Sequence, residues 1–250
     1  MIFKVIAIIL LNFLVFSSYA EKTIIIQSTT SIKNSGFYDY ILPLIKKDLD
    51  IRAKVIAVGS GAAIKNTMNC DGDLLIVHSP VQEKEFISKG YAEKSYYFMH
   101  NYFVIIGPKS DPAGIKGIIY PEEIFKKIFN KKVLFISRGD NSGTHNKELG
   151  YWNKINLNPI PFSGKWYLET GTSMGATINT SIGLGAYTLS DKASWLSFSN
   201  KLDHVVLLEG TKSLFNPYSA IAVNKNKCPM TKLEESQSII RWLLSEKGKK

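Results

Sequence analysis

The segment 137–145, Ser-Arg-Gly-Asp-Asn-Ser-Gly-Thr-His, carries the residues with the clearest chemistry. It follows an apolar run at 133–136 that reads as a buried strand, and a helical pattern comes after it. A Gly/Ser/Thr turn between a strand and a helix start directs backbone N–H groups at an anion. The Arg138 guanidinium adds forked donors that match a tetrahedral oxyanion. We therefore predict an oxyanion site here; the alternative is an ordinary turn before a capped helix.

The same segment permits a second interpretation, a Ser-dependent hydrolase. Ser142 and His145 would be nucleophile and base, with Asp140 or Glu148 as the third member. Residues i and i+3 at a helix start rarely align for attack, and the chain has no G-x-S-x-G elbow. We therefore expect no enzymatic activity.

The N-terminus predicts export. Lys4 precedes the apolar runs 5–11 and 13–16, and Ser18 and Ala20 stand at −3 and −1 of a cleavage site after Ala20. The apolar run is shorter than the ~20 residues of a spanning helix. No Cys lies at the cleavage point. We expect residues 1–20 to be a signal peptide and the mature protein to be a periplasmic protein without a lipid anchor.

Composition restricts the partners. The formal net charge is +10, which suits nucleic acid, an anionic surface or an anionic solute. Export and the lack of a nucleic-acid motif argue against nucleic acid. Cys70 and Cys228 could pair in an oxidising compartment, and both border turn signals, so we expect both near the surface. The four histidines show no metal-ligand spacing, so we expect no metal site and no cofactor.

Short Ile/Val-rich runs alternate with helical patterns, which predicts an α/β protein with mostly parallel sheets. No flexible linker divides the chain, so we expect two lobes joined by strands that hinge around Phe103 and Tyr218. Lobe I would comprise 21–102 and 213–250, and lobe II 103–212. A helix after Pro80 should carry Glu83 outward. The expected strands are 23–28, 53–58, 74–77, 103–108, 133–136, 186–189, 205–208 and 218–224.

Four strand-to-helix junctions are rich in Gly, Ser and Thr, at 28–31, 59–61, 137–145 and 171–173. Ligands of open α/β sheets bind beyond the carboxyl ends of strands, where such loops converge. Each junction alone could be an ordinary N-cap. Together they predict a site built of hydrogen-bond donors.

Motifs along nearly the whole mature chain resemble the TupA family, the tungstate-binding proteins of bacterial ABC uptake systems. The likeness runs from about Thr23 to Trp242. It departs at 31–33, where Ser-Ile-Lys stands in place of the usual Ser-Thr-Asp, and the chain ends at Lys250, earlier than the resemblance leads us to expect. The matching motifs are 29–31, 34–36, 58–62, 74–78, 101–108, 111–114, 137–145, 166–167, 174–175, 186–189 and 216–218.

The resemblance implies a two-lobed, type II-like periplasmic binding protein, a monomer whose lobes close over one oxyanion and deliver it to an ABC permease and its ATPase. From lobe I it implies the donors Thr30, Ser31 and Ser60. From lobe II it implies the donors Arg138, Ser142, Gly143 and Thr144. Further candidates are Thr29, His78, His145 and Ser173.

The ligand is expected to be tungstate, with molybdate as a second possibility; phosphate, sulfate and vanadate are alternatives on the same fold. Phosphate keeps a proton at neutral pH and benefits from an acidic acceptor, whereas tungstate and molybdate are fully deprotonated. Positions 77–79 hold no Asp or Glu, which favours the proton-free anion. The sequence does not rank tungstate against molybdate. It also leaves open whether His78 is a ligand or a structural residue.

Overall fold

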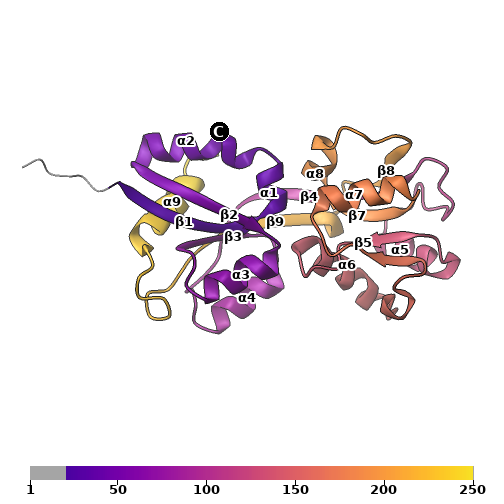
Figure 1. Ribbon diagram of the computed structural model, residues 1–250, viewed down its shortest axis with the longest axis horizontal. Helices are drawn as coiled ribbons and strands as arrows, with labels where there is room; N and C mark the ends of the chain where they lie inside the picture. The colour runs from indigo at the N-terminus through magenta and orange to yellow at the C-terminus, as the bar shows by residue number, and fades with distance from the viewer. Residues whose placement is uncertain (1–20, 250) are drawn as a thin grey trace, which may run out of the picture.

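The computed structural model describes residues 21–249, which form two lobes lying end to end (Figure 1). The expected signal peptide, residues 1–20, lies outside the described residues. Within 21–249, no helix has the length and apolar character needed to cross a membrane.

Lobe I is a sheet with helices on both faces. Its strand order is β2-β1-β3-β9-β4, of which β4 belongs to this sheet only in its first half. The core contains Ile24 and Ile26 of the sheet, Ile41 of α2 and Ile240 of α9 on one face, while α3 and α4 pack on the other. The elements are β1 (Lys22–Thr29), α1 (Thr30–Asn34), α2 (Phe37–Leu49), β2 (Ile51–Val58), α3 (Ser60–Met68), β3 (Leu74–Val77), α4 (Pro80–Ser88), β4 (Tyr96–Pro108), β9 (Phe215–Ala222) and α9 (Leu233–Leu244).

Lobe II repeats this layering around the second half of β4. The helices α5 and α6 cover one face over an aromatic core that includes Phe125, Phe135, Trp152 and Tyr167, and α7 and α8 cover the other face. The elements are α5 (Pro121–Lys131), β5 (Phe135–Ser137), α6 (Gly143–Lys154), η1 (Ile160–Phe162), β6 (Tyr167–Glu169), α7 (Met174–Gly183), β7 (Tyr187–Asp191), α8 (Lys192–Ser197), β8 (His204–Leu208) and η2 (Lys212–Leu214).

Two strands connect the lobes. Up to Tyr102, β4 pairs with β9 of lobe I, and from Phe103 it pairs with β7 of lobe II. The chain returns from lobe II to lobe I where η2 leads into β9 at Phe215. The second connection between the lobes therefore lies near Phe215 and not at the expected Tyr218, which is buried in lobe I. The lobe limits at 102/103 and 212/213 remain our proposal, and the change of pairing within β4 supports the first of them.

The sheets are mixed rather than mostly parallel. Within residues 21–249, four strand pairs are parallel (β1 with β2, β1 with β3, β5 with β6 and β5 with β7), and every antiparallel pair includes β4 or β9. The prediction of mostly parallel sheets is therefore wrong. Parallel order comes from helical crossovers inside one lobe, whereas a strand that crosses between lobes enters the sheet without such a crossover.

Two further expectations concern burial. Cys70 and Cys228 form a disulfide with their Cα atoms 5.4 Å apart, but only Cys70 is at the surface, because Cys228 is 1% exposed.

Glu83 of α4 is buried, which differs from the prediction that it faces outward. Its carboxylate accepts the backbone N–H of Ser79 at 3.0 Å at the start of α4, where that amide has no helical acceptor.

Candidate functional site

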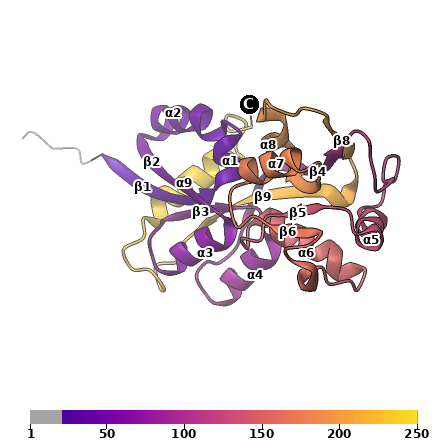
Figure 2. The same ribbon diagram turned by 45° about the vertical axis from the view of Figure 1, so that its right-hand side comes forward.

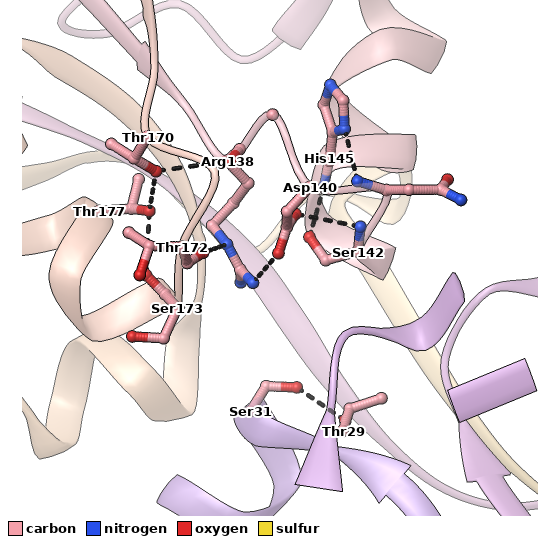
Figure 3. Close-up of polar contacts among 12 residues, drawn as sticks. Thr29, Ser31, Arg138, Asp140, Ser142, His145, Thr170, Thr172, Ser173 and Thr177 are labelled. Carbon is pink, nitrogen blue, oxygen red and sulfur yellow. Dashed lines mark hydrogen bonds and ion pairs between the residues drawn. The ribbon is translucent and has the colours of Figure 1, made fainter. Parts of the chain in front are cut away.

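Helix N-termini from both lobes face each other where the lobes meet. A Cβ built on Gly59, which caps α3, would lie 3.7 Å from Asp140 Oδ2 and 3.8 Å from Ser142 Cβ, which precede α6. Figure 3 shows Arg138 between the start of α7 and the Asp140–Ser142 turn, with Thr29 and Ser31 of lobe I across the interface. Free N–H groups and helix dipoles make such ends attractive to anions.

Arg138 is the buried cation of this region, with 4% of its surface exposed. Its Nε donates to the carbonyl of Thr172 at 2.6 Å, and its Nη2 pairs with Asp140 Oδ2. The other oxygen of Asp140 accepts the Ser142 N–H at 3.1 Å. Nη1 makes no hydrogen bond within residues 21–249. Two of the three nitrogens are thus held in place, and a donor remains for a ligand.

The turn that presents Arg138 depends on glycine. Gly139 has a φ of +59°, a left-handed conformation that costs glycine least. A Cβ there would also lie 2.8 Å from Glu169 Cβ. Both constraints fix the path of the chain between Arg138 and Asp140.

The start of α6 offers unused backbone donors. Ser142 caps the helix, and its Oγ accepts the His145 N–H at 3.2 Å. The N–H groups of Gly143 and Thr144, both buried residues, have no acceptor among the described residues. Buried N–H groups are rarely left unpaired in native proteins. An anion placed here would accept from both.

Ser60 at the start of α3 is a second buried and unpaired donor. Its side chain is fully buried, and its Oγ has no hydrogen-bond partner in the part of the chain described. A buried hydroxyl left without a partner costs about 1–3 kcal/mol. A ligand that accepts from Ser60 would remove that cost.

Ser31 is held in a network centred on His78. His78 Nε2 lies 3.2 Å from Ser31 Oγ, and Nδ1 lies 2.9 Å from Asn216 Oδ1. The His78 ring stacks on Tyr218 at 4.6 Å between centroids. Burial lowers the pKa of His78, against an opposing effect of the Asp191 carboxylate, so the imidazole is neutral.

The tautomer decides what Ser31 can offer. With the Asn216 amide oxygen facing Nδ1, the proton of the neutral ring is on Nδ1, and Nε2 accepts the Ser31 hydroxyl proton. The side chain of Ser31 is then engaged within lobe I. Its backbone N–H in the first turn of α1 is the donor left for a ligand.

The lobes touch around these residues. A Cβ on Gly143 would lie 2.5 Å from His78 Cε1, and a Cβ on Gly61 would lie 2.6 Å from Asn141 Nδ2. Gln82 Nε2 donates to Asn141 Oδ1 at 3.2 Å. The structure is therefore a closed arrangement in which glycines allow the lobes to approach.

The structure gathers most of the residues predicted from sequence. Lobe II presents Arg138 and Ser142 on one loop and Gly143 and Thr144 at the start of the helix that follows, with Ser173 capping the neighbouring helix α7. The lobe I candidates lie at the facing strand ends and helix starts: Thr29, Thr30, Ser31, Ser60 and His78. Which of them contact a ligand stays a prediction.

His145 does not pair with Ser142 as a hydrolase would require. Its Nδ1 accepts the backbone N–H of Asn141 at 3.0 Å, and its Nε2 has no partner in residues 21–249. Burial lowers the pKa of His145. The only Ser142–His145 hydrogen bond here is the backbone cap, so no nucleophile and base are aligned.

Sequence reasoning missed three supporting residues, Asp140 as partner of Arg138, Asn216 as partner of His78, and Asp191. Asp191 is fully buried and caps α8, and its Oδ1 accepts from Ser194 N–H at 2.9 Å and Asn101 Nδ2 at 3.2 Å. Its Oδ2 has no partner in the described chain. An Asp between an expected strand and a helix start is an N-cap signal that would have marked it.

Residues 21–249 contain no group of three or more His, Cys, Asp or Glu placed to hold a metal ion.

Comparison with known proteins agrees with this architecture. Residues 17–247 match the PBP superfamily domain, so the molecule is a two-lobed protein of the periplasmic binding protein class. The tungstate-binding protein TupA of Peptoclostridium acidaminophilum is 38% identical over 232 residues, covering 92% of this chain and 80% of that protein. The chain belongs to the TupA family of tungstate-binding proteins.

Solved structures give the same result. The tungstate ABC transporter structure from Geobacter sulfurreducens aligns with a TM-score of 0.82 at 38% identity, covering 92% of this chain and 97% of that one. The tungstate-binding protein TupA from Desulfovibrio alaskensis G20 aligns with a TM-score of 0.76 at 39% identity, covering 90% of each chain. The resemblance noted from sequence motifs is confirmed.

Proposed function

We propose that this protein is an exported solute-binding protein that captures one tetrahedral oxyanion between its lobes. The observation that carries the proposal is a set of buried donors without acceptors, the Ser60 hydroxyl and the Gly143 and Thr144 N–H groups, beside the Arg138 cation. Hydrogen-bond donors from both lobes suit a tetrahedral anion, because its oxygens accept hydrogen bonds on all sides. No cofactor is part of this proposal.

Tungstate is the proposed anion, and molybdate the alternative. The family relationship supports this choice, because similar proteins from four bacteria are named for tungstate. Positions 77–79 hold no Asp or Glu that could accept the proton of phosphate. The structure adds Asp140, whose two oxygens are both engaged, and Asp191, which keeps one oxygen free. The family relationship, rather than the lack of an acidic acceptor, therefore favours tungstate over phosphate.

Calorimetric titration with tungstate, molybdate, vanadate, sulfate and phosphate tests the proposal. We expect tungstate and molybdate to bind far more tightly than phosphate or sulfate. Tight phosphate binding without tungstate binding would overturn the choice of anion. Equal and weak binding of all five would overturn the site itself.

The family relationship and the closed arrangement support delivery of the anion to an ABC importer. We propose that a permease with its ATPase recognises the closed protein, a monomer in the periplasm, and that the protein performs no catalysis. The unaligned Ser142 and His145 support the last point. Turnover of ester or phosphoester substrates that is lost in Ser142→Ala would contradict it.

A further inference from the structure

A second cleft lies beside the oxyanion site, with a volume of about 730 Å³. Its lining comes from the start of α4 in lobe I, from α6 in lobe II, and from the segment 212–217 that joins the lobes. His78 and Gly143, which pack closely against each other, line this cleft on the side of the oxyanion site. The volume is that of a cavity for a small organic molecule and far exceeds the need of one oxyanion.

Lys147 of α6 is the unusual residue in this cleft. Its Nζ lies 5.8 Å from the Phe103 ring centroid and 5.5 Å from the Tyr151 ring centroid. The side chain is half-buried, and no carboxylate among the described residues forms an ion pair with it. Burial lowers the pKa of Lys147, and the charge of Lys154 adds to this effect. A partly desolvated cation held only by aromatic faces would gain from an anionic partner.

The other lining residues indicate what kind of anion fits. Lys154 is already paired with Glu122 at 3.0 Å, so its charge is largely satisfied. At the rim, Val81 is 79% exposed and Phe215 is 37% exposed. Among the described residues, the half-buried Lys147 and the exposed Lys212 both line the cleft without a carboxylate partner, and exposed apolar groups lie around them. Such a lining suits a molecule with an apolar body and a negatively charged group. A bare inorganic oxyanion would leave the apolar walls in water.

We propose that this cleft is a second binding site, for a small organic anion with an apolar, ring-sized body whose carboxylate pairs with Lys147. Because the lining comes from both lobes, a bound molecule would favour the closed arrangement. The proposal does not depend on the identity of the oxyanion, since the Arg138 loop contributes no charged group to this cleft.

Titration of the purified protein with benzoate in oxyanion-free buffer, followed by calorimetry or ligand-observed NMR, tests the proposal. Benzoate should bind, and benzamide, which has the same shape without the charge, should bind at least about ten-fold more weakly. Lys147→Met should weaken benzoate binding by about ten- to a hundred-fold, and Lys147→Arg should retain most of it. Circular dichroism of both variants separates a lost contact from a lost fold.

Lys201 provides the matched control. It is also half-buried over an aromatic ring, 5.0 Å from the Trp195 centroid, and lies outside the cleft. Lys201→Met and Arg138→Ala should both leave benzoate binding unchanged. Absence of benzoate binding up to about 10 mM would overturn the proposal. So would equal binding to Lys147→Met and wild type, or a loss confined to Arg138→Ala, which would place benzoate in the oxyanion site.

Discussion

At the scale of single residues, the site depends on a few side chains whose own partners hold them still. Arg138 is oriented by the Thr172 carbonyl and by Asp140, which also binds the Ser142 N–H. One carboxylate therefore fixes both the guanidinium and the start of α6. Preorganisation of this kind reduces the entropy that binding must otherwise overcome.

Replacing Arg138 tests its charge. Loss of a charge-assisted bond to a buried anion costs about 2–5 kcal/mol, so Arg138→Ala should weaken tungstate binding by tens- to thousands-fold. Arg138→Lys keeps the charge but loses the fork and should give an intermediate Kd. Calorimetry measures both. Wild-type affinity in Arg138→Ala would mean that the anion binds elsewhere.

Glu148 lies under the Arg138 loop and should make stability depend on pH. Burial raises the pKa of Glu148 from 4.5 to about 7, although its oxygens accept from Ser137, Trp152 and Tyr167. A carboxyl whose folded pKa is raised favours folding at low pH. Its contribution is complete below the unfolded pKa and is lost as pH rises through the folded value.

We therefore expect the free energy of unfolding to lose up to about 3 kcal/mol from this group as pH rises from near 4.5 to above 7. In Glu148→Gln this loss is absent, so the variant should gain stability relative to wild type over the same range. Urea unfolding at a series of pH values measures the difference. Glu123→Gln, at an exposed position, serves as control. The expectation would be contradicted if the difference in free energy of unfolding between Glu148→Gln and wild type did not change with pH.

The sequence allowed the lobe II half of the site to be predicted because strand, turn, Arg and helix start are contiguous within 137–145. Local hydrogen-bonding rules act over such distances. The Ser31–His78–Asn216 network joins residues from three distant parts of the chain, and only the folded sheet brings them together. For this reason the engagement of the Ser31 hydroxyl was not predictable.

At the scale of elements, the strand positions were predicted closely. β3 coincides with the expected 74–77, and β1, β2, β5, β7, β8 and β9 differ from the expected strands by one to three residues at their ends. The long β4 begins at Tyr96 rather than at the expected 103, and β6 was not predicted. Runs of apolar residues identify strands directly. Strand direction depends on which lobe a strand enters from, and no local pattern records that. The mixed order around β4 and β9 was therefore missed.

The helix starts of α3 and α6 also decide how closely the lobes approach. A Cβ on Gly61 would lie 2.6 Å from Asn141 Nδ2 and 3.0 Å from the Asn141 backbone oxygen. A side chain can rotate away, but the backbone oxygen belongs to the Arg138 loop. Gly61 therefore limits how closely the lobes approach, although it is not among the residues predicted to bind the anion.

Gly61→Ala should weaken tungstate binding about ten-fold, because overpacking a tight contact typically costs about 1–3 kcal/mol. The effect acts on the closed state only, so the unfolding temperature without ligand should stay near that of wild type. Gly183→Ala, in α7 with no atom within 4 Å of the added Cβ, is the control and should bind normally. Equal affinity of the two variants would show that the contact at Gly61 is not required for binding.

At the scale of the whole molecule, two strands between two compact lobes permit a hinge (Figure 2). A ligand that contacts both lobes stabilises the closed state selectively. We expect the radius of gyration from small-angle scattering to fall when tungstate is added and to reach the value calculated for the closed structure. A radius that does not change at saturating tungstate would exclude the hinge. Sulfate, as a weak binder, should leave the radius unchanged.

The place of β9 has a consequence for the order in which the molecule is built. A ribosome makes the chain from its N-terminus, so β3 and β4 exist long before β9, the strand that lies between them. The sheet of lobe I stays incomplete until residue 222 has been made, whereas lobe II has all its strands by residue 208. Lobe I, which contains the first strand to be made, is therefore completed after lobe II. Cys228 comes later still, so its bond to Cys70 can form only when the final strand is available.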